Sequence, residues 1–183
     1  NGFRVRLARD GEVLVTLDDV ARTLTADDLL ICDATDRPIG IAGIMGGQNT
    51  EISDTTSTIA LETAWFEPAA IMRSATRLGL RSEASARFER GVDPLGIDHG
   101  VARFVELLAL TCPGLVVHQG MVDARTEHLP ATTALALRPA RVSALLGTAF
   151  DARAIRSLLE PIGFGVAADG ADLVVTVPSW RPD

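Results

Sequence analysis

EPAAIMRSATRLG, residues 67–79, is the stretch that decides the fold class. Pro68 lies where the first turn of a helix accepts proline, and Gly79 lies just past the end, where glycine commonly terminates helices. The segment therefore predicts a helix over residues 68–78. Because predicted strands precede this helix without a regular strand–helix alternation, the sequence indicates an α+β domain with a mixed or antiparallel sheet and packed helices.

Several strand-like segments precede the helix. Residues 3–17 predict a β-hairpin, in which an Asp-Gly turn joins FRVRLAR to EVLVTL. Further strands are predicted at residues 27–34, 37–45 and 58–66, the first two joined by a turn at Asp36–Pro38.

A second, longer helix is predicted to begin at Asp93 and Pro94, because apolar residues follow at helical spacing. The polar stretch 123–133 has no periodicity and predicts a domain boundary near residue 130, giving domains 1–130 and 131–183. The second domain is predicted to be a small α+β module of two helices and a hairpin, with one helix capped by Asp151.

The composition limits the function classes. A 47% apolar and 22% charged content is typical of a globular protein with a core, and no stretch reaches the roughly 20 apolar residues that span a membrane. The formal charge of −7 argues against a large nucleic-acid footprint, although a local arginine patch can still contribute to one. The absence of lysine excludes a phosphate-binding P-loop and a Schiff base.

Two stretches suggest a ligand pocket. The glycine run GIAGIMGGQNTE (40–51) is either a tight turn or a loop that admits a ligand close to the backbone. On the predicted strand 58–66, Glu62 shares a face with Ala60 and Ala64, so its carboxylate lies in a recess with little crowding. The alternative for Glu62 is an exposed glutamate beside small residues.

Five arginines gather in and after the first helix: positions 73 and 77 lie on one face of it, and positions 81, 87 and 90 follow its end. They form either a basic ledge that holds an anion or surface ion pairs with Glu83 and Glu89 on a solvated helix face. The three histidines, His99, His118 and His128, have neither catalytic-triad partners nor metal-ligand spacing, and each is expected to be solvated.

Four quoted stretches together carry a family resemblance. GIMGG (43–47), LETAWFEP (61–68) and RSATRLGLRSEASARFERGVDP (73–94) resemble the editing domain of bacterial phenylalanyl-tRNA synthetase beta subunits. The C-terminal stretch, from LRPARVSALLG to VPSWRPD, resembles the module that follows in the same subunit and is likened to nucleic-acid-binding folds. The resemblance covers essentially the whole chain in the right order.

The resemblance implies hydrolysis of tyrosyl-tRNA(Phe) that the synthetase has mischarged. Glu62 is implied to contact the phenolic hydroxyl of tyrosine, while the pocket wall is implied to include Gly46, Gly47, Ser82 and Ala84. Phenylalanine would leave such polar groups unpaired, at about 1–3 kcal/mol each. No nucleophilic side chain is implied, so water attacks the ester, and the arginine ledge either holds the domain's own carboxylates or lies beside the tRNA.

The resemblance also implies a larger assembly in the cytoplasm, with two alpha and two beta subunits, tRNA(Phe), ATP and Mg²⁺ as partners and cofactors of the parent enzyme. Asp183 is implied to be the first ligand of a magnesium site whose other ligands lie beyond this chain. The family's editing domain carries a histidine-bearing segment upstream of Asn1, so the editing domain is expected to be truncated. The alternative function is a non-catalytic scaffold or tRNA-binding fragment of the same subunit.

Overall fold

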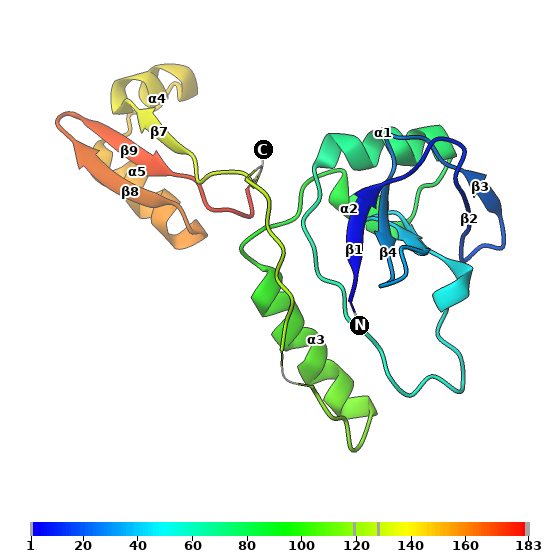
Figure 1. Cartoon of the computed structure of the whole chain (residues 1–183). Helices are drawn as coiled ribbons and strands as arrows, with labels where there is room; N and C mark the ends of the chain where they lie inside the picture. Colours follow the sequence, from blue (N-terminus) through cyan, green and yellow to red (C-terminus); the bar gives the residue numbers. More distant parts are fainter. Residues whose placement is uncertain (1, 119, 128, 182–183) are drawn as a thin grey trace. The chain divides into compact units, whose positions relative to one another are not determined.

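The computed structural model describes residues 2–118, 120–127 and 129–181, and the chain divides into two compact units. The first unit contains residues 1–92 and 97–104; the second contains residues 93–96 and 105–183. Each unit combines helices with antiparallel strands (Figure 1), which confirms the predicted α+β class.

The first unit is built on a four-stranded antiparallel sheet with the strand order β1-β4-β5-β6 and a separate two-stranded ribbon, β2-β3. Its elements, in chain order, are β1 (Arg4–Leu7), β2 (Val13–Val15), β3 (Ala21–Thr23), β4 (Leu29–Cys32), β5 (Pro38–Ile41), β6 (Met45–Gly46), the short 3₁₀ helix η1 (Gln48–Thr50), α1 (Pro68–Leu78) and α2 (Glu83–Phe88). The long helix α3 (Ile97–Thr111) begins in this unit and ends in the second.

The predicted hairpin over residues 3–17 is wrong in its pairing. The turn exists, since Glu12 N donates to Arg9 O at 2.9 Å and Gly11 has a φ of 78°. However, β1 pairs with β4 and β2 pairs with β3. The chain leaves β1 for a different ribbon because the backbone after the turn bonds to Leu24, with Gly11 N donating to Leu24 O at 3.0 Å.

Partly buried ion pairs reinforce this arrangement. The Arg6 guanidinium on β1 donates to Glu12 Oε1 at 2.8 Å and to Asp36 Oδ1 at 3.0 Å, so it joins the turn before β2 to the β4–β5 turn. The Arg6 hydrogen bonds lower the pKa of Glu12 to about 2, although partial burial opposes this shift. The predicted turn between β4 and β5 is confirmed, with Asp36 at a φ of 69°.

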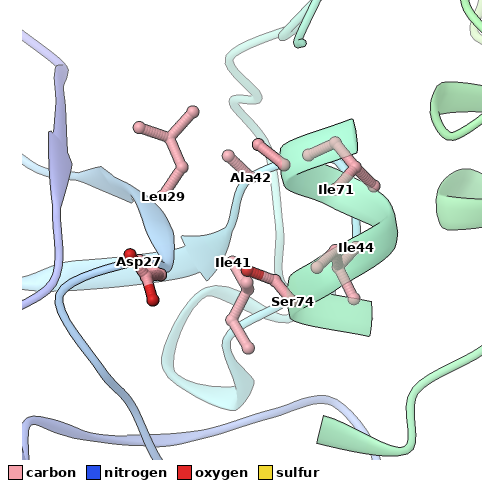
Figure 2. Close-up of a pocket in the computed structure, with 8 residues that line it drawn as sticks. Asp27, Leu29, Ile41, Ala42, Ile44, Ile71 and Ser74 are labelled. Atoms are coloured by element: carbon pink, nitrogen blue, oxygen red, sulfur yellow. The ribbon is translucent and has the colours of Figure 1, made fainter. Parts of the chain in front are cut away.

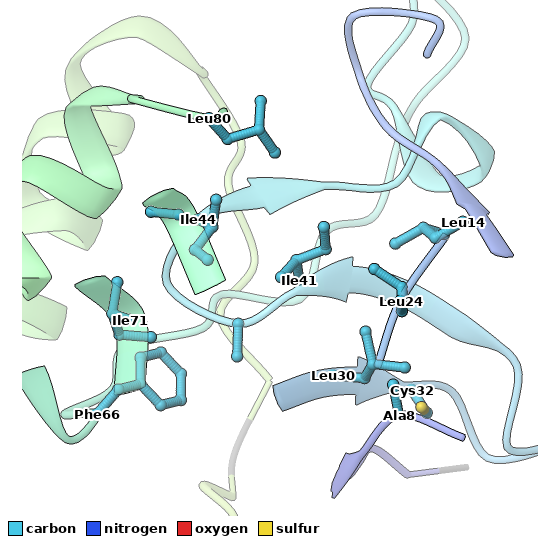
Figure 3. Packing of buried hydrophobic residues seen from close by; sticks show 12 residues of the cluster. Ala8, Leu14, Leu24, Leu30, Cys32, Ile41, Ile44, Phe66, Ile71 and Leu80 are labelled. Atoms are coloured by element: carbon cyan, nitrogen blue, oxygen red, sulfur yellow. The ribbon is translucent and has the colours of Figure 1, made fainter. Parts of the chain in front are cut away.

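The core of the first unit lies between the sheet, the β2–β3 ribbon and α1 (Figure 3). Leu24, Leu30 and Cys32 are fully buried, and Ile41 and Ile71 are nearly so. Burying an apolar side chain of this size stabilises a fold by about 1.5–3 kcal/mol, so this cluster is what holds α1 against the sheet.

The strand predicted over residues 58–66 is wrong, because the structure assigns neither helix nor strand to residues 51–67. The face that Glu62 was predicted to share with Ala64 does not form an open recess along a strand: Phe66 is buried and Ala64 packs against the core, whereas Ile59 and Leu61 are exposed. Alternating apolar residues give a strand only where a neighbouring backbone supplies hydrogen bonds, and here none does.

Of the three α-helices that begin in the described part of the first unit, α1 agrees with the prediction, α3 begins later than predicted, and α2 was not predicted. α1 is confirmed, with Glu67 accepting from the Ala70 amide at 2.6 Å and Gly79 ending the helix at a φ of 64°. α3 begins at Ile97, later than the predicted Asp93, because residues 94–95 form a turn in which Asp93 accepts from the Leu95 amide. α2 was not predicted as a separate helix.

The second unit contains a three-stranded antiparallel sheet in the order β7-β9-β8 with two helices, as predicted for the module. Its elements are β7 (Ala134–Leu137), α4 (Pro139–Leu146), α5 (Ala152–Leu159), the 3₁₀ helix η2 (Glu160–Ile162), β8 (Gly165–Asp169) and β9 (Asp172–Thr176). The Asp151 cap of α5 is confirmed by a 2.7 Å hydrogen bond from the Ala154 amide. Ile155, Leu173 and Val175 form its small buried core.

Among the described residues, no helix is both long enough and apolar enough to cross a membrane.

Candidate functional site

The β5–β6 turn is the point where the sheet approaches both helices. Gly43 has a φ of 66°, and a Cβ at this position would lie 3.0 Å from both Ile71 Cδ1 and Phe66 Cδ2 and 3.2 Å from Phe88 Cδ2. The Phe66 and Phe88 rings themselves lie 5.1 Å apart. Glycine is therefore required at position 43 by conformation and by space, and the sequence interpretation did not single out this residue within the glycine run.

Gly46 and Gly47 also lie in tight surroundings. A Cβ on Gly46 would lie 3.2 Å from Leu17 Cδ1, and a Cβ on Gly47 would lie 2.9 Å from the Ile39 carbonyl oxygen. These contacts come from the domain's own residues, which agrees with the tight-turn interpretation of the glycine run. Whether the same glycines form the wall of a ligand pocket stays a prediction.

The first turn of α2 adjoins the β5–β6 turn through Ser82. The Ser82 hydroxyl donates to the Ile44 carbonyl oxygen at 2.6 Å and accepts from the Ser85 amide at 3.0 Å. The Ser85 hydroxyl in turn accepts from the Ser82 amide, which completes a reciprocal N-terminal cap. Ala84 lies in the same turn and is exposed, so it presents only a methyl group to whatever approaches α2.

Glu62 lies in the irregular segment that leads into α1. Its side chain makes no hydrogen bond or ion pair with any described residue, and the residue is exposed. Nearby protein atoms nevertheless desolvate the carboxyl and raise its pKa above the ordinary value. Glu62 is thus a carboxyl with unused hydrogen-bonding capacity in a partly dehydrated position. No described hydrogen bond connects it with Ser82, so the grouping of these residues in one pocket stays a prediction.

The five arginines divide into two sets. Three of them lie beside carboxylates. Arg77 pairs with Asp28. Arg81 Nη2 lies 3.6 Å from Glu89 Oε1, and Arg87 Nη2 lies 3.1 Å from Glu83 Oε2. Arg73 and Arg90 are exposed and form no ion pair with any described residue. The alternative of surface ion pairs therefore holds for Arg81 and Arg87, while Arg73 and Arg90 remain available to an outside anion.

The Arg77–Asp28 pair is structural. Asp28 is fully buried and also accepts from the Thr25 amide at 2.8 Å. Burial alone would raise the pKa of Asp28, but hydrogen bonds from Arg77, Thr25 and the Ser74 side chain hold it below the usual value. Its second oxygen, Oδ1, is buried and accepts no hydrogen bond from a described residue.

Two cavities lie beside α1. The first, between α1 and β5 (Figure 2), is lined mainly by apolar side chains together with Asp27 and Ser74, and it has a volume of about 10 Å³. It has room for about one water molecule, so it is a packing gap and not a substrate site.

The second cavity, which we call the α1–α2 groove, has a volume of about 300 Å³. It is lined by Met72, Ala75, Thr76, Leu80, Arg81 and Glu89. Neither cavity is lined by Glu62, Gly46, Gly47, Ser82 or Ala84.

Two of the three histidines lie within the described residues. His99 and His118 are exposed, whereas His128 and Asp183 lie outside the described residues. Within the described part of the chain, no three His, Cys, Asp or Glu side chains lie close enough together to hold a metal ion.

Comparison with known proteins gives two family matches. Residues 1–113 match the B3/4 domain, and residues 135–183 match the tRNA synthetase B5 domain. Among curated relatives, the chain is 48% identical over 99% of its length to the phenylalanine–tRNA ligase beta subunit of Nitratidesulfovibrio vulgaris. It is 45% and 44% identical, each over 98% of its length, to the beta subunits from Streptomyces avermitilis and Salinibacter ruber. The chain spans only 21–22% of the length of these relatives.

Proposed function

The chain belongs to the B3/4 domain family, and from this premise we propose that its first unit hydrolyses tyrosyl-tRNA(Phe) as the editing part of a phenylalanine–tRNA ligase beta subunit. In the parent enzyme this reaction would remove tyrosine that had been attached in place of phenylalanine. Binding to a single pocket discriminates poorly between amino acids as similar as tyrosine and phenylalanine. A separate editing site adds a second selection step that removes the wrong product.

The observation that carries the proposal is the state of Glu62. Its carboxyl is partly desolvated and has no hydrogen-bond donor among the described residues. A phenolic hydroxyl can supply that donor, whereas phenylalanine would leave the carboxyl unpaired in a dehydrated position. Glu62 therefore favours tyrosine by about 1–3 kcal/mol, the cost of an unsatisfied polar group.

The chemical step follows from the same assignment. Glu62 binds the far end of the tyrosine side chain, so it is a specificity residue and does not deprotonate the nucleophile. Water attacks the ester carbonyl and the bond to the terminal ribose oxygen breaks, which releases tyrosine and tRNA. Positioning by the pocket and by the tRNA's own terminal hydroxyl supplies the rate enhancement.

The partners belong to the same proposal. The parent would act in the cytoplasm with an alpha subunit and tRNA(Phe), as an assembly of two alpha and two beta subunits, and would use ATP and Mg²⁺ for aminoacylation. Arg73 and Arg90, which have no carboxylate partner in the described structure, are the residues of this chain that we assign to tRNA contact. Arg77 and Arg87 pair closely with carboxylates, and Arg81 Nη2 lies 3.6 Å from Glu89 Oε1, so we expect these three to contribute less.

The test is deacylation of purified tyrosyl-tRNA(Phe) by the 183-residue chain, beside phenylalanyl-tRNA(Phe). Glu62→Gln is expected to reduce the preference for the tyrosyl ester by about tenfold or more, since 1.4 kcal/mol is tenfold. Glu83→Gln is the matched control, because Glu83 is an exposed carboxylate of α2 with 88% of its side chain open to solvent. A full-length relative that contains the matched region serves as the positive control.

The second candidate is a scaffold or tRNA-binding fragment without hydrolytic activity. It is favoured by the observation that Glu62 lines neither of the two cavities described beside α1. If the chain binds tRNA(Phe) but hydrolyses neither ester, while the full-length relative hydrolyses the tyrosyl ester, this second candidate replaces the first.

A further inference from the structure

The α1–α2 groove is lined by none of the residues assigned to the editing pocket. We propose that it binds a small free amino acid in its zwitterionic form, with an apolar side chain. The proposal goes beyond the editing function and does not depend on it, because the groove is lined by neither Glu62 nor Ser82.

The groove has the size and the mixed lining of a small-molecule site. Its volume of about 300 Å³ lies at the lower end of the range for such sites. Ala75 and Leu80 are buried and Met72 is half-exposed, so they form an apolar floor on one side of the groove. An apolar side chain of a few carbons would displace water from this floor.

The rim of the groove carries one positive and one negative group. Arg81 Nη2 lies 3.6 Å from Glu89 Oε1, which is too long for a hydrogen bond. The Arg81 side chain is 78% exposed and that of Glu89 only 20% exposed, and neither makes a side-chain hydrogen bond within the described structure. A shielded carboxylate and a guanidinium thus face each other with their hydrogen-bonding capacity unused.

This pair matches the head of an amino acid. A ligand carboxylate would accept two parallel N–H bonds from the Arg81 fork, and the ligand ammonium would donate to Glu89. The existing ion pair is loose and largely exposed on the arginine side, so its opening costs little. The Thr76 hydroxyl, which has no hydrogen-bond partner in the described chain, supplies a further polar contact at the same wall.

Charge selects this class of ligand over simple ions. An inorganic anion at Arg81 would lie beside the Glu89 carboxylate, and a simple cation at Glu89 would lie beside the Arg81 guanidinium. Each would meet a like charge at close range, whereas a zwitterion satisfies both groups at once. An apolar molecule without the charged head would leave both groups unpaired.

The test is titration of the isotope-labelled 183-residue chain with L-leucine, followed by backbone amide NMR shifts. Saturable shifts are expected at Thr76, Leu80, Arg81 and Glu89. N-acetyl-L-leucine lacks the ammonium group, L-leucinamide lacks the carboxylate and glycine lacks the apolar side chain. Each is expected to bind at least about tenfold more weakly than L-leucine, and these comparisons need no variant protein.

Variants provide the second arm. Arg81→Gln and Glu89→Gln are each expected to weaken L-leucine binding about tenfold, while Arg87→Gln is the matched control because Arg87 pairs with Glu83 outside the groove. The proposal is overturned if L-leucine causes no saturable shifts in these residues, if the three analogues bind equally well, or if inorganic phosphate gives the same shifts. None of these results would alter the deacylation test of Glu62.

Discussion

Arg77 on α1 and Asp28 before β4 form an ion pair across 49 positions of sequence, and the Asp28 carboxylate is fully buried. The pair fixes α1 to the sheet that carries the β5–β6 turn. It also removes Arg77 from the set of arginines that could meet an outside ligand. One residue of an apparent basic ledge is therefore part of the fold.

Removing the arginine should leave a buried, unpaired carboxylate. Loss of one member of a buried pair costs about 3–5 kcal/mol, and since Arg77 is itself partly exposed we expect Arg77→Leu to lower the free energy of unfolding by about 2–3 kcal/mol. Urea denaturation followed by Trp65 fluorescence, in a Trp180→Phe background, measures the free energy of unfolding of the first unit. Arg73→Leu, at an unpaired exposed site, should change stability by about 0.5 kcal/mol or less. Equal losses in the two variants would contradict the structural role of the pair.

Acid should destabilise the first unit through Glu12. Its pKa falls from 4.5 to about 2 on folding, so its ionised form stabilises the fold above about pH 4.5 and this contribution is lost as the pH falls towards 2. The shift corresponds to at most about 3 kcal/mol. Glu12→Gln should be less stable than the unaltered chain at pH 7, and its stability should fall less steeply between pH 4.5 and 2. Chemical denaturation at a series of pH values gives the free energy of unfolding of both proteins as a function of pH. If it falls equally steeply in both between pH 4.5 and 2, Glu12 makes no such contribution.

Two glycines with nearly the same φ should respond differently to alanine. Gly43 and Gly79 have φ values of 66° and 64°, but only a Cβ at Gly43 would meet other atoms, at 3.0 Å. Gly79→Ala should cost about 1 kcal/mol for the left-handed conformation. Gly43→Ala adds overpacking against Phe66 and Ile71 and should cost about 2–4 kcal/mol. The difference, measured by thermal or urea unfolding, isolates the packing; if both variants lose the same stability, the close approach at Gly43 is absent.

Glu62→Gln should separate specificity from folding. Desolvation raises the pKa of the Glu62 carboxyl without any described partner, so its charge does not stabilise the fold at neutral pH. We expect the free energy of unfolding to stay within about 0.5 kcal/mol while the preference for the tyrosyl ester falls. Urea denaturation followed by circular dichroism measures the free energy of unfolding of the variant and of the unaltered chain. A large loss of stability would mean that Glu62 has a structural role.

Salt dependence should identify the arginines that contact tRNA. Arg73→Gln and Arg90→Gln should each reduce the slope of log affinity against log salt concentration by about 0.7–0.9, the value for one phosphate contact. Arg87→Gln should change the slope less, because Arg87 already pairs with Glu83. Filter binding of tRNA(Phe) at several salt concentrations gives the slopes. If all three variants have the same slope, Arg73 and Arg90 do not contact tRNA phosphates.

Local signals in the sequence predicted the local structure well. α1 begins at Pro68 and ends before Gly79, and Asp151 caps α5, as the sequence predicts. These ends are predictable because a helix end depends on a few adjacent residues. The missed helix α2 also has such a signal, since Ser82 and Ser85 stand in the spacing of a reciprocal cap.

Non-local relationships were not predictable in the same way. Nothing near β1 in the sequence specifies that it pairs with β4 and not with β2, because that choice depends on contacts such as the Arg6 bonds to Glu12 and Asp36. The alternation in residues 58–66 has the period of a strand, but a strand also needs a partner backbone. Glu62 was identified as a candidate from its small neighbours and from resemblance, while its desolvated state depends on atoms that only the folded chain brings near.

The irregular segment that carries Glu62 has a consequence for hydrogen exchange. Within residues 52–66 the described structure holds a single backbone-to-backbone hydrogen bond, from Thr56 to Ser53. Its amides should exchange with solvent far faster than those of β4, since little protects them. If a ligand engages Glu62 as proposed, we expect it to restrict the motion of this segment at a cost in chain entropy, and slower amide exchange there would then report that the ligand is bound.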